Sequence, residues 1–384
     1  MKQRRSRRRI LLLSFFVPLF ALLCLFVQRG IFPFGEESFL RTDLYHQYAP
    51  FFSEFQYKLQ HGGSLLYSWD IGLGVNFTAI YAYYLASPLN WFVVLFPKRY
   101  VIEFVTLLIV VKTALSSVSM TYYLLRHSSR DGLFAPIFGI LYAFSAYMAA
   151  YSWNVMWLDC IVLFPLILLG MEEMVRGESS MKYILCLGLS ILSNYYISIM
   201  ICLFLVFYAV FQAITAELGL AETGKAALRF AIASLIAAGL AAVVLLPEIF
   251  ALRLTASGEM NFPKTFESYF SIVDMMARQL PFVECEIGLD HWPNIYCGIF
   301  TLQLLLLYFS SREVPIKQRV GYALFLLFFF ASFSVNVLNY IWHGFHYPNS
   351  LPARQSFIFC FLVLYLSFQA LERFPRFSPR EIFL

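Results

Sequence analysis

Apolar stretches long enough to cross a lipid bilayer recur along the whole chain, and polar segments separate them. A helix needs about 20 consecutive apolar residues to cross the hydrocarbon core. Runs of this kind predict ten helices, at residues 10–30, 101–125, 133–150, 156–173, 181–195, 197–215, 226–250, 296–310, 320–339 and 356–371. The pattern therefore predicts an all-α integral membrane protein that forms a single polytopic domain over residues 1–384.

The polar segments suggest which side of the membrane each end of a helix faces. The N-terminus begins "MKQRRSRRRI", and basic segments usually stay in the cytoplasm. Alternating from there places the short basic connectors inside and the long loops 31–100 and 251–295 outside. Together the outer segments hold five of the six histidines and five of the six tryptophans. We therefore expect the chemistry on the outer face, with juxtamembrane helices in the first outer loop.

Two apolar segments allow more than one reading. Ile10 to Val27 is long for a signal peptide and no small-residue cleavage site follows it, so we interpret it as a retained first helix. Residues 77–97 are apolar but rich in aromatic residues and contain two prolines. This segment is interpreted as an interfacial or re-entrant piece. If it crosses the membrane instead, the topology shifts by one.

The composition agrees with a membrane protein. The chain is 60% hydrophobic and 13% charged, with a mean hydropathy of +0.70. Such a chain has too little polar surface to cover a soluble globule, so lipid must act as part of its solvent. The net charge of +5 then reflects membrane topology and not nucleic-acid binding. Polar residues within apolar segments become the informative ones.

The first candidate site lies in "TDLYHQYAPFF", directly after the first helix. If this segment is helical, Asp43, His46 and Gln47 share one face, and Thr42 can cap the helix. One interpretation is a capped amphipathic helix that lies on the membrane. The other is an acid, a base or a metal ligand at the lip of a cavity.

The second candidate is Asp159 in "WNVMWLDCIVLF", a turn or two into an apolar helix. A carboxylate at that depth costs a few kcal/mol unless it is paired or hydrated. We therefore expect Asp159 to face the bundle interior, either as a functional group or in a structural hydrogen bond. Lys112 lies within another predicted helix, where pairing with an acidic group is the favoured interpretation.

Two later outer segments carry further polar groups. "VECEIGLDHWPNIYCG" contains Glu284, Asp290 and His291, which suit a divalent metal, although their spacing matches no specific site and a solvated loop is the favoured interpretation. "HGFHYPNSLPARQSFIF" places Arg354 at the outer start of a helix. Arginine there can hold a phosphate by two hydrogen bonds, or it can reach the lipid head groups.

Several of these strings resemble the bacterial YfhO-like membrane proteins. The likeness begins near residue 30 and covers most of the chain, through "TDLYHQYAPFF", "GGSLLYSWDIGLGVNF", "YYLASPLN", "WNVMWLDCIVLFPLILLG", "PNIYCG" and "HGFHYPNSLPARQSFIF". That family is similar to C-type glycosyltransferases, which have a many-helix GT-C bundle and take a sugar from a polyprenyl-phosphate carrier. Its members are associated with adding sugars to lipoteichoic acid or related polysaccharides. The resemblance implies a multi-pass protein of the bacterial cell membrane, with membrane lipid around it and an extracellular active site.

The resemblance also implies roles for particular residues. Asp43 matches the acidic position in the first outer loop, whose expected role is general base or acceptor positioning, with or without a metal. We expect Arg354 to hold the carrier phosphate and Asp159 to orient the acceptor or Asp43. Expected substrate-binding residues besides Arg354 are His46, Gln47, Asn349 and His291. Candidates for binding a divalent metal are Asp43, Glu284 and Asp290.

Two other functions remain open. The first is a transporter or flippase of lipid-linked sugars, which usually has polar groups and broken helices at mid-membrane depth. The second is a non-catalytic partner. Members of the family are usually about twice as long, so we expect this chain to lack their C-terminal region.

Overall fold

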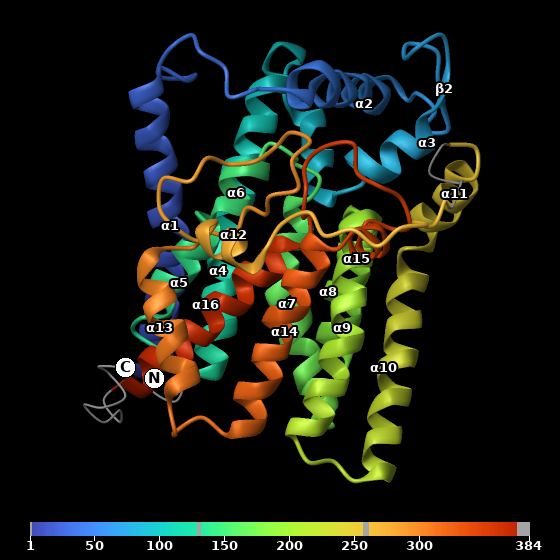
Figure 1. Ribbon diagram of the computed structural model, residues 1–384. Helices are drawn as coiled ribbons and strands as arrows, with labels where there is room; N and C mark the ends of the chain where they lie inside the picture. The colour runs from blue at the N-terminus through green and yellow to red at the C-terminus, as the bar shows by residue number, and fades with distance from the viewer. Residues whose placement is uncertain (1, 129–131, 256–260, 375–384) are drawn as a thin grey trace.

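The structure, a computed structural model, describes residues 2–128, 132–255 and 261–374. Its helices run between two faces (Figure 1). The start of α1 (Lys2–Arg29) and the end of α16 (Ser356–Arg373) lie at one face, which we call the N-terminal face. Helix α2 (Ala49–His61) lies across the opposite face, which we call the loop face.

All ten predicted apolar segments are helical in the structure. Besides α1 and α16, they form α4 (Val101–His127), α5 (Ala135–Ala143), α6 (Ala146–Tyr151), α7 (Leu158–Val175), α8 (Met181–Ser193), α9 (Tyr195–Thr215), α10 (Leu220–Leu240), α11 (Ala242–Leu252), α13 (Ile299–Ser310), α14 (Ile316–Ser334) and α15 (Asn336–Trp342). Among the described residues, six helices are long and apolar enough to cross a membrane: α1, α4, α9, α10, α14 and α16. The all-α membrane fold is therefore confirmed, whereas ten crossings stay a prediction.

Three of the predicted segments are interrupted at the loop-face side. In two of these breaks, a free backbone amide donates a hydrogen bond to a residue that is distant in sequence. Between α5 and α6, the amide of Ala146 donates to the carbonyl of Tyr296 at 2.8 Å. Between α14 and α15, the amide of Asn336 donates to Glu267 at 3.1 Å. Backbone groups away from water need such partners. The third interruption separates α10 from α11 at Ala241.

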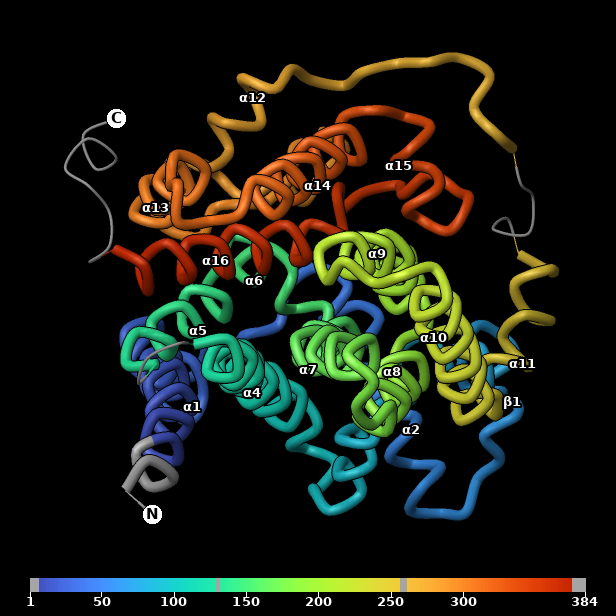
Figure 2. Tube along the Cα trace, turned by 90° about the horizontal axis from the view of Figure 1, so that it is seen from below, coloured from blue at the N-terminus to red at the C-terminus, as the bar shows by residue number. Residues whose placement is uncertain are grey.

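Helix α16 is the central element of the bundle. Figure 2 shows it between α13 and α14 on one side and α4, α5 and α7 on the other. Of the apolar window in α16, 83% is buried inside the protein, compared with 11% for α10 at the edge. The core is therefore built around α16, while α10 presents most of its surface outward.

Close helix contact in the bundle depends on small residues. Gly170 of α7 lies against the backbone of α8, where an added Cβ would lie 2.5 Å from the amide nitrogen of Tyr183. Packing between helices in lipid relies on such approach because lipid tails are as apolar as the side chains. Gly170 therefore fixes the distance between α7 and α8.

Residues 31–100 cover much of the loop face. After α2 come a short antiparallel pair, β1 (Tyr67–Ser68) with β2 (Val75–Asn76), and then α3 (Phe77–Ile80). The rest of the ambiguous segment forms a π-helical turn, η2 (Tyr81–Leu85), and a 3₁₀ helix, η3 (Pro88–Leu95). None of these turns has spanning length, which agrees with an interfacial or re-entrant piece. That they lie outside the membrane stays a prediction. In loop 251–295, the described residues include α12 (Ile272–Ala277).

Candidate functional site

Four segments that are distant in sequence converge where α7 begins at the loop face. The hydroxyl of Tyr48, from the first loop, donates to Asn154 Oδ1 at 2.9 Å. The hydroxyl of Tyr151 donates to the carbonyl of Pro352 at 2.6 Å. Asn194, between α8 and α9, donates through Nδ2 to the carbonyl of Tyr83 at 3.0 Å. These bonds position the side chains described next.

Arg354 lies at this convergence, just before α16. Its guanidinium donates to the Tyr196 hydroxyl at 3.0 Å and to the carbonyls of Ser350 and Leu351 at 3.0 and 3.2 Å. The same group lies 5.3 Å from the ring centroids of Trp157 and Tyr196. Ring faces attract cations at such distances. Among the described residues, Arg354 forms no ion pair, so its positive charge remains available to an anionic ligand.

Arg354 stays charged throughout the physiological pH range, because a guanidinium group does not lose its proton in proteins. The arginine is therefore a permanent cation held beside a cluster of aromatic side chains. This aromatic cluster consists of Tyr48, Tyr83, Tyr84, Trp157 and Tyr196.

Asp43 is exposed on the same face, in front of a π-helical turn, η1 (Leu44–Tyr48), that leads into α2. The buried side chains of Leu44 and Tyr48 anchor this turn, which leaves the Asp43 side free. The expected cap was wrong: Thr42 has φ +47°, and its hydroxyl donates to the Arg41 carbonyl at 2.8 Å. The left-handed conformation of Thr42 turns its side chain away from the helix amides.

Asp43 and Arg354 shift the pKa values of the same two tyrosines, Tyr48 and Tyr84, in opposite directions. Burial raises the pKa of Tyr48 and of Tyr84, the charge of Asp43 raises both further, and Arg354 lowers both. A carboxylate and a guanidinium from opposite ends of the sequence therefore lie within electrostatic range of one tyrosine pair. The two rings are 5.3 Å apart between centroids.

The neighbours of Asp43 divide between solvent and this cluster. Gln47 is half-buried, and its hydrogen bond to Tyr84 lowers the pKa of that tyrosine. His46 is exposed, with its ring edge-on to Tyr45 at 5.2 Å between centroids. Gln47 thus belongs to the tyrosine cluster, while His46 faces outward beside Asp43.

Asp159 is buried, as expected, and both of its oxygens have partners. Lys112 Nζ lies 2.6 Å from Oδ2, and the Ser87 hydroxyl donates to Oδ1 at 2.9 Å. Lys112 also donates to the Val155 carbonyl at 3.1 Å. The predicted pairing of Lys112 with an acid is confirmed. This geometry favours the structural alternative for Asp159, which ties α4 and residues 77–97 to α7, and its catalytic role stays a prediction.

The remaining candidates lie apart from one another. His291 stacks on Tyr269 with ring centroids 3.5 Å apart, and burial lowers the pKa of His291 while Asp290 opposes this. The side chains of Glu284, Asp290 and Asn349 are exposed. Within the described part of the chain, no three His, Cys, Asp or Glu side chains gather as a metal site requires. Asp43, Glu284 and Asp290 therefore do not form one metal site together.

Sequence reasoning did not single out the aromatic cluster or Glu248 as parts of this site. The sequence "AIYAYYLAS" contains the signal for the cluster, because tyrosine recurs there within an apolar stretch. Glu248 of α11 is buried, and its Oε1 accepts a hydrogen bond from Tyr195 at 2.6 Å. Tyr195 in turn packs edge-on against Tyr83 at 5.9 Å between centroids. A second carboxylate therefore borders the tyrosine cluster.

Comparisons with known proteins give one family. The profile of the family described as "Bacterial membrane protein YfhO" matches residues 14–384. Searches of curated proteins and of solved structures gave no match.

Proposed function

Because the chain belongs to the bacterial YfhO membrane protein family, we propose that it is a membrane glycosyltransferase. It moves a sugar from a polyprenyl-phosphate carrier to an envelope polymer, either lipoteichoic acid or a related polysaccharide. The site is the loop-face cluster around Asp43 and Arg354, and this face is extracellular.

The observation that carries this proposal is the guanidinium of Arg354, which bonds to Tyr196, lies over the Trp157 ring and forms no ion pair among the described residues, on the same face as the exposed Asp43. Glycosyl transfer from a lipid phosphate needs a base for the acceptor hydroxyl and a cation for the departing phosphate. The exposed carboxylate of Asp43 suits the first task. The guanidinium of Arg354, which no carboxylate of the described residues neutralises, suits the second.

The proposed reaction is a single group transfer. The acceptor hydroxyl oxygen attacks the anomeric carbon of the sugar, and its proton passes to Asp43. The bond between that carbon and the phosphate oxygen breaks, and its electron pair leaves with the polyprenyl phosphate. Arg354 stabilises the added negative charge, while tyrosine and tryptophan rings offer surfaces on which a sugar can stack. Gln47 and His46 lie close enough to Asp43 to contact the acceptor.

The test measures sugar transfer by the purified protein in lipid, supplied with a polyprenyl-phosphate sugar and lipoteichoic acid. Asp43→Asn keeps the shape of the side chain but removes the base, so we expect a loss of about 10²–10⁴-fold. Asp70→Asn is the matched control, because Asp70 is an exposed aspartate in the same loop and its loss should leave transfer unchanged. The assay is run with and without added Mg²⁺ or Mn²⁺.

The results separate the alternatives. Transfer that survives Asp43→Asn would support the proposed glycosyltransferase activity and contradict the role of Asp43 as its general base. Absence of transfer with several donor sugars, combined with movement of the lipid-linked sugar across the membrane, would favour a flippase. Absence of both would favour a non-catalytic partner.

A further inference from the structure

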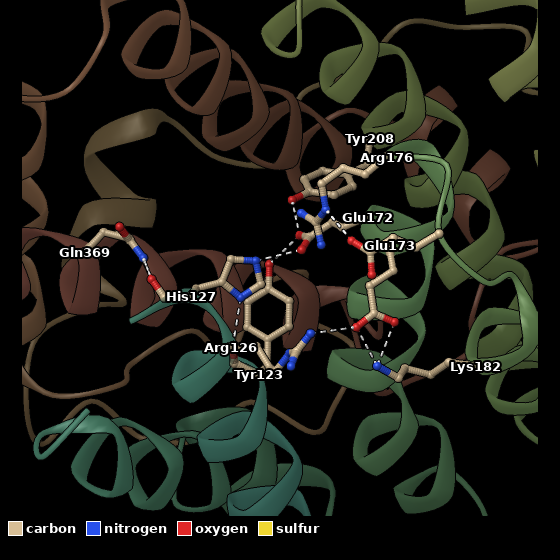
Figure 3. Close-up of polar contacts among 10 residues, drawn as sticks. Tyr123, Arg126, His127, Glu172, Glu173, Arg176, Lys182, Tyr208 and Gln369 are labelled. Carbon is tan, nitrogen blue, oxygen red and sulfur yellow. Dashed lines mark hydrogen bonds and ion pairs between the residues drawn. The ribbon is translucent and has the colours of Figure 1, made fainter. Parts of the chain in front are cut away.

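A second polar cluster lies near the ends of α4 and α7 that are away from the proposed site, and Figure 3 shows its side chains. Glu172 of α7 accepts hydrogen bonds at Oε1 from Tyr123 at 2.7 Å and from Tyr208 at 2.8 Å. Its Oε2 lies 2.6 Å from His127 Nε2. All oxygens of this buried carboxylate are therefore engaged.

The pair of His127 and Glu172 is neutral as a whole. His127 Nδ1 lies 2.8 Å from the carbonyl of Tyr123, which can only accept, so Nδ1 carries a hydrogen. One proton then lies between Nε2 and Oε2. Whether it belongs to the imidazole or to the carboxyl group, the two charges sum to zero. The pair has no net charge and therefore does not neutralise charged side chains nearby.

Beside this pair lies a polar pocket of about 220 Å³. Its lining includes Gln212 and Gln318, which offer amide donors, and the guanidinium groups of Arg176 and Arg373. Arg373 bonds to the carbonyl of Gln369 at 2.9 Å, and Arg176 lies 3.3 Å from the exposed carboxylate of Glu178. An exposed pair such as the latter is weak, because water screens it. The lining thus carries an excess of positive charge and suits an anion.

An apolar groove of about 460 Å³ adjoins this pocket between α9 and α14. Phe207, Val210, Leu324 and Phe328 contribute to its walls. Phe211 lines both the groove and the polar pocket, with its ring packed directly on Gly321. The side chain of Phe211 therefore lies between the positively charged pocket and the apolar groove.

We propose that the pocket and groove together bind an anionic phospholipid from the leaflet at the N-terminal face. The phosphate lies between Arg176 and Arg373, and an acyl chain lies along the α9–α14 groove. A pocket of this size is smaller than the roughly 300–1,000 Å³ of sites that enclose drug-sized ligands, so it fits a head group and not a nucleotide sugar. The charge of the lining selects phosphatidylglycerol over zwitterionic phosphatidylcholine. This proposal does not depend on sugar transfer at the loop face.

The experiment titrates the purified full chain in detergent with short-chain phosphatidylglycerol or phosphatidylcholine and counts bound lipid by native mass spectrometry. We expect Arg373→Gln and Arg176→Gln each to weaken phosphatidylglycerol binding about fivefold, as expected for one basic residue near a lipid phosphate. Arg373→Lys should retain the preference, because it keeps the charge. Lys225→Gln, at an exposed position near the start of α10, is the matched control and should change nothing.

A second variant tests the groove. Leu324→Trp fills the chain site and should weaken both lipids by the same factor. Equal binding of the two lipids by the native chain would overturn the proposal, as would a phosphatidylglycerol preference that persists when both arginines are replaced. Displacement of phosphatidylglycerol by inorganic phosphate at equal concentration would identify a free-phosphate site and also overturn it. Failure of sugar transfer would leave this result unaffected.

Discussion

Lys112 Nζ lies 2.6 Å from Asp159 Oδ2, and both side chains are buried in the bundle. Removing one partner leaves an uncompensated charge away from water. We therefore expect Lys112→Met and Asp159→Leu each to lower the free energy of unfolding, the lysine variant by about 3–5 kcal/mol. Denaturant unfolding in detergent measures this. The double variant Lys112→Met with Asp159→Leu should recover most of the loss, and a double variant as unstable as the sum of the singles would contradict the pairing.

Replacing Arg354 tests the cation at the aromatic cluster. If Arg354 stabilises the departing phosphate, Arg354→Gln should lower kcat for sugar transfer by about 10²–10³-fold, the usual loss when one charge-stabilising donor is removed. Arg354→Lys should retain part of the rate, because it keeps the charge but loses the planar fork. The control is Arg99→Gln, whose guanidinium lies 4.7 Å from the Tyr100 ring before α4. An unchanged kcat in Arg354→Gln would assign that arginine to lipid head groups alone.

His343 makes stability depend on pH. Its pKa is lowered from 6.5 to about 3, mainly by burial and also by Arg354, His346 and His291, while a hydrogen bond to Asn339 opposes this. The unfolded chain takes up a proton below pH 6.5, whereas the folded chain does not until about pH 3. The stabilisation is thus present above pH 6.5 and is lost progressively as the pH falls towards 3. Unfolding midpoints in detergent between pH 7 and pH 4 should fall, and His343→Gln should flatten this profile. His61→Gln, at an exposed position on α2, should leave the profile unchanged.

Cys285 reports which face is extracellular. Its side chain is exposed in the loop-face segment before Trp292. Cys24 is exposed within the candidate membrane span of α1, where an impermeant reagent does not reach, and Cys160, Cys297 and Cys360 are buried. A membrane-impermeant maleimide should therefore label Cys285 in intact cells, and Cys285→Ser should abolish that labelling. Neighbouring side chains partly cover the thiol and raise the pKa of Cys285, although Arg278 and Arg41 oppose this, so a mildly alkaline medium is needed.

An engineered cysteine at the opposite face provides the control for orientation. Glu178→Cys, in the Cys285→Ser background, lies at an exposed position in the connection between α7 and α8 and should react only after the cells are permeabilised. Labelling of Glu178→Cys but not of Cys285 in intact cells would reverse the proposed topology.

The helices could be predicted because a chain in lipid must form its backbone hydrogen bonds within each spanning segment. A run such as 101–125 satisfies its backbone hydrogen bonds within one helix, so length and hydropathy suffice to predict it. The interruptions could not be predicted in the same way. The break before α15 uses a hydrogen bond to Glu267, and that partner is known only once the loop has folded over the bundle.

The site was only partly predictable for a related reason. The cost of a charge in lipid predicts that Asp159 and Lys112 each need a partner. Their pairing with each other depends on the rotation of α4 and α7, which apolar patterning leaves undetermined. Tyr83 and Tyr84 resemble ordinary interfacial aromatics in sequence, and only the fold brings them near Arg354.

The central position of α16 determines the order in which the protein can assemble. The ribosome makes this helix after α4, α5, α7, α13 and α14, which flank it, so those helices must wait in the membrane with their inner surfaces unpaired. Arg354 arrives with α16, two residues before its first residue, Ser356. Closure of the bundle and delivery of the cation to the tyrosine cluster are therefore a single event, and a nascent chain that has not reached this helix holds Asp43 without its counterpart.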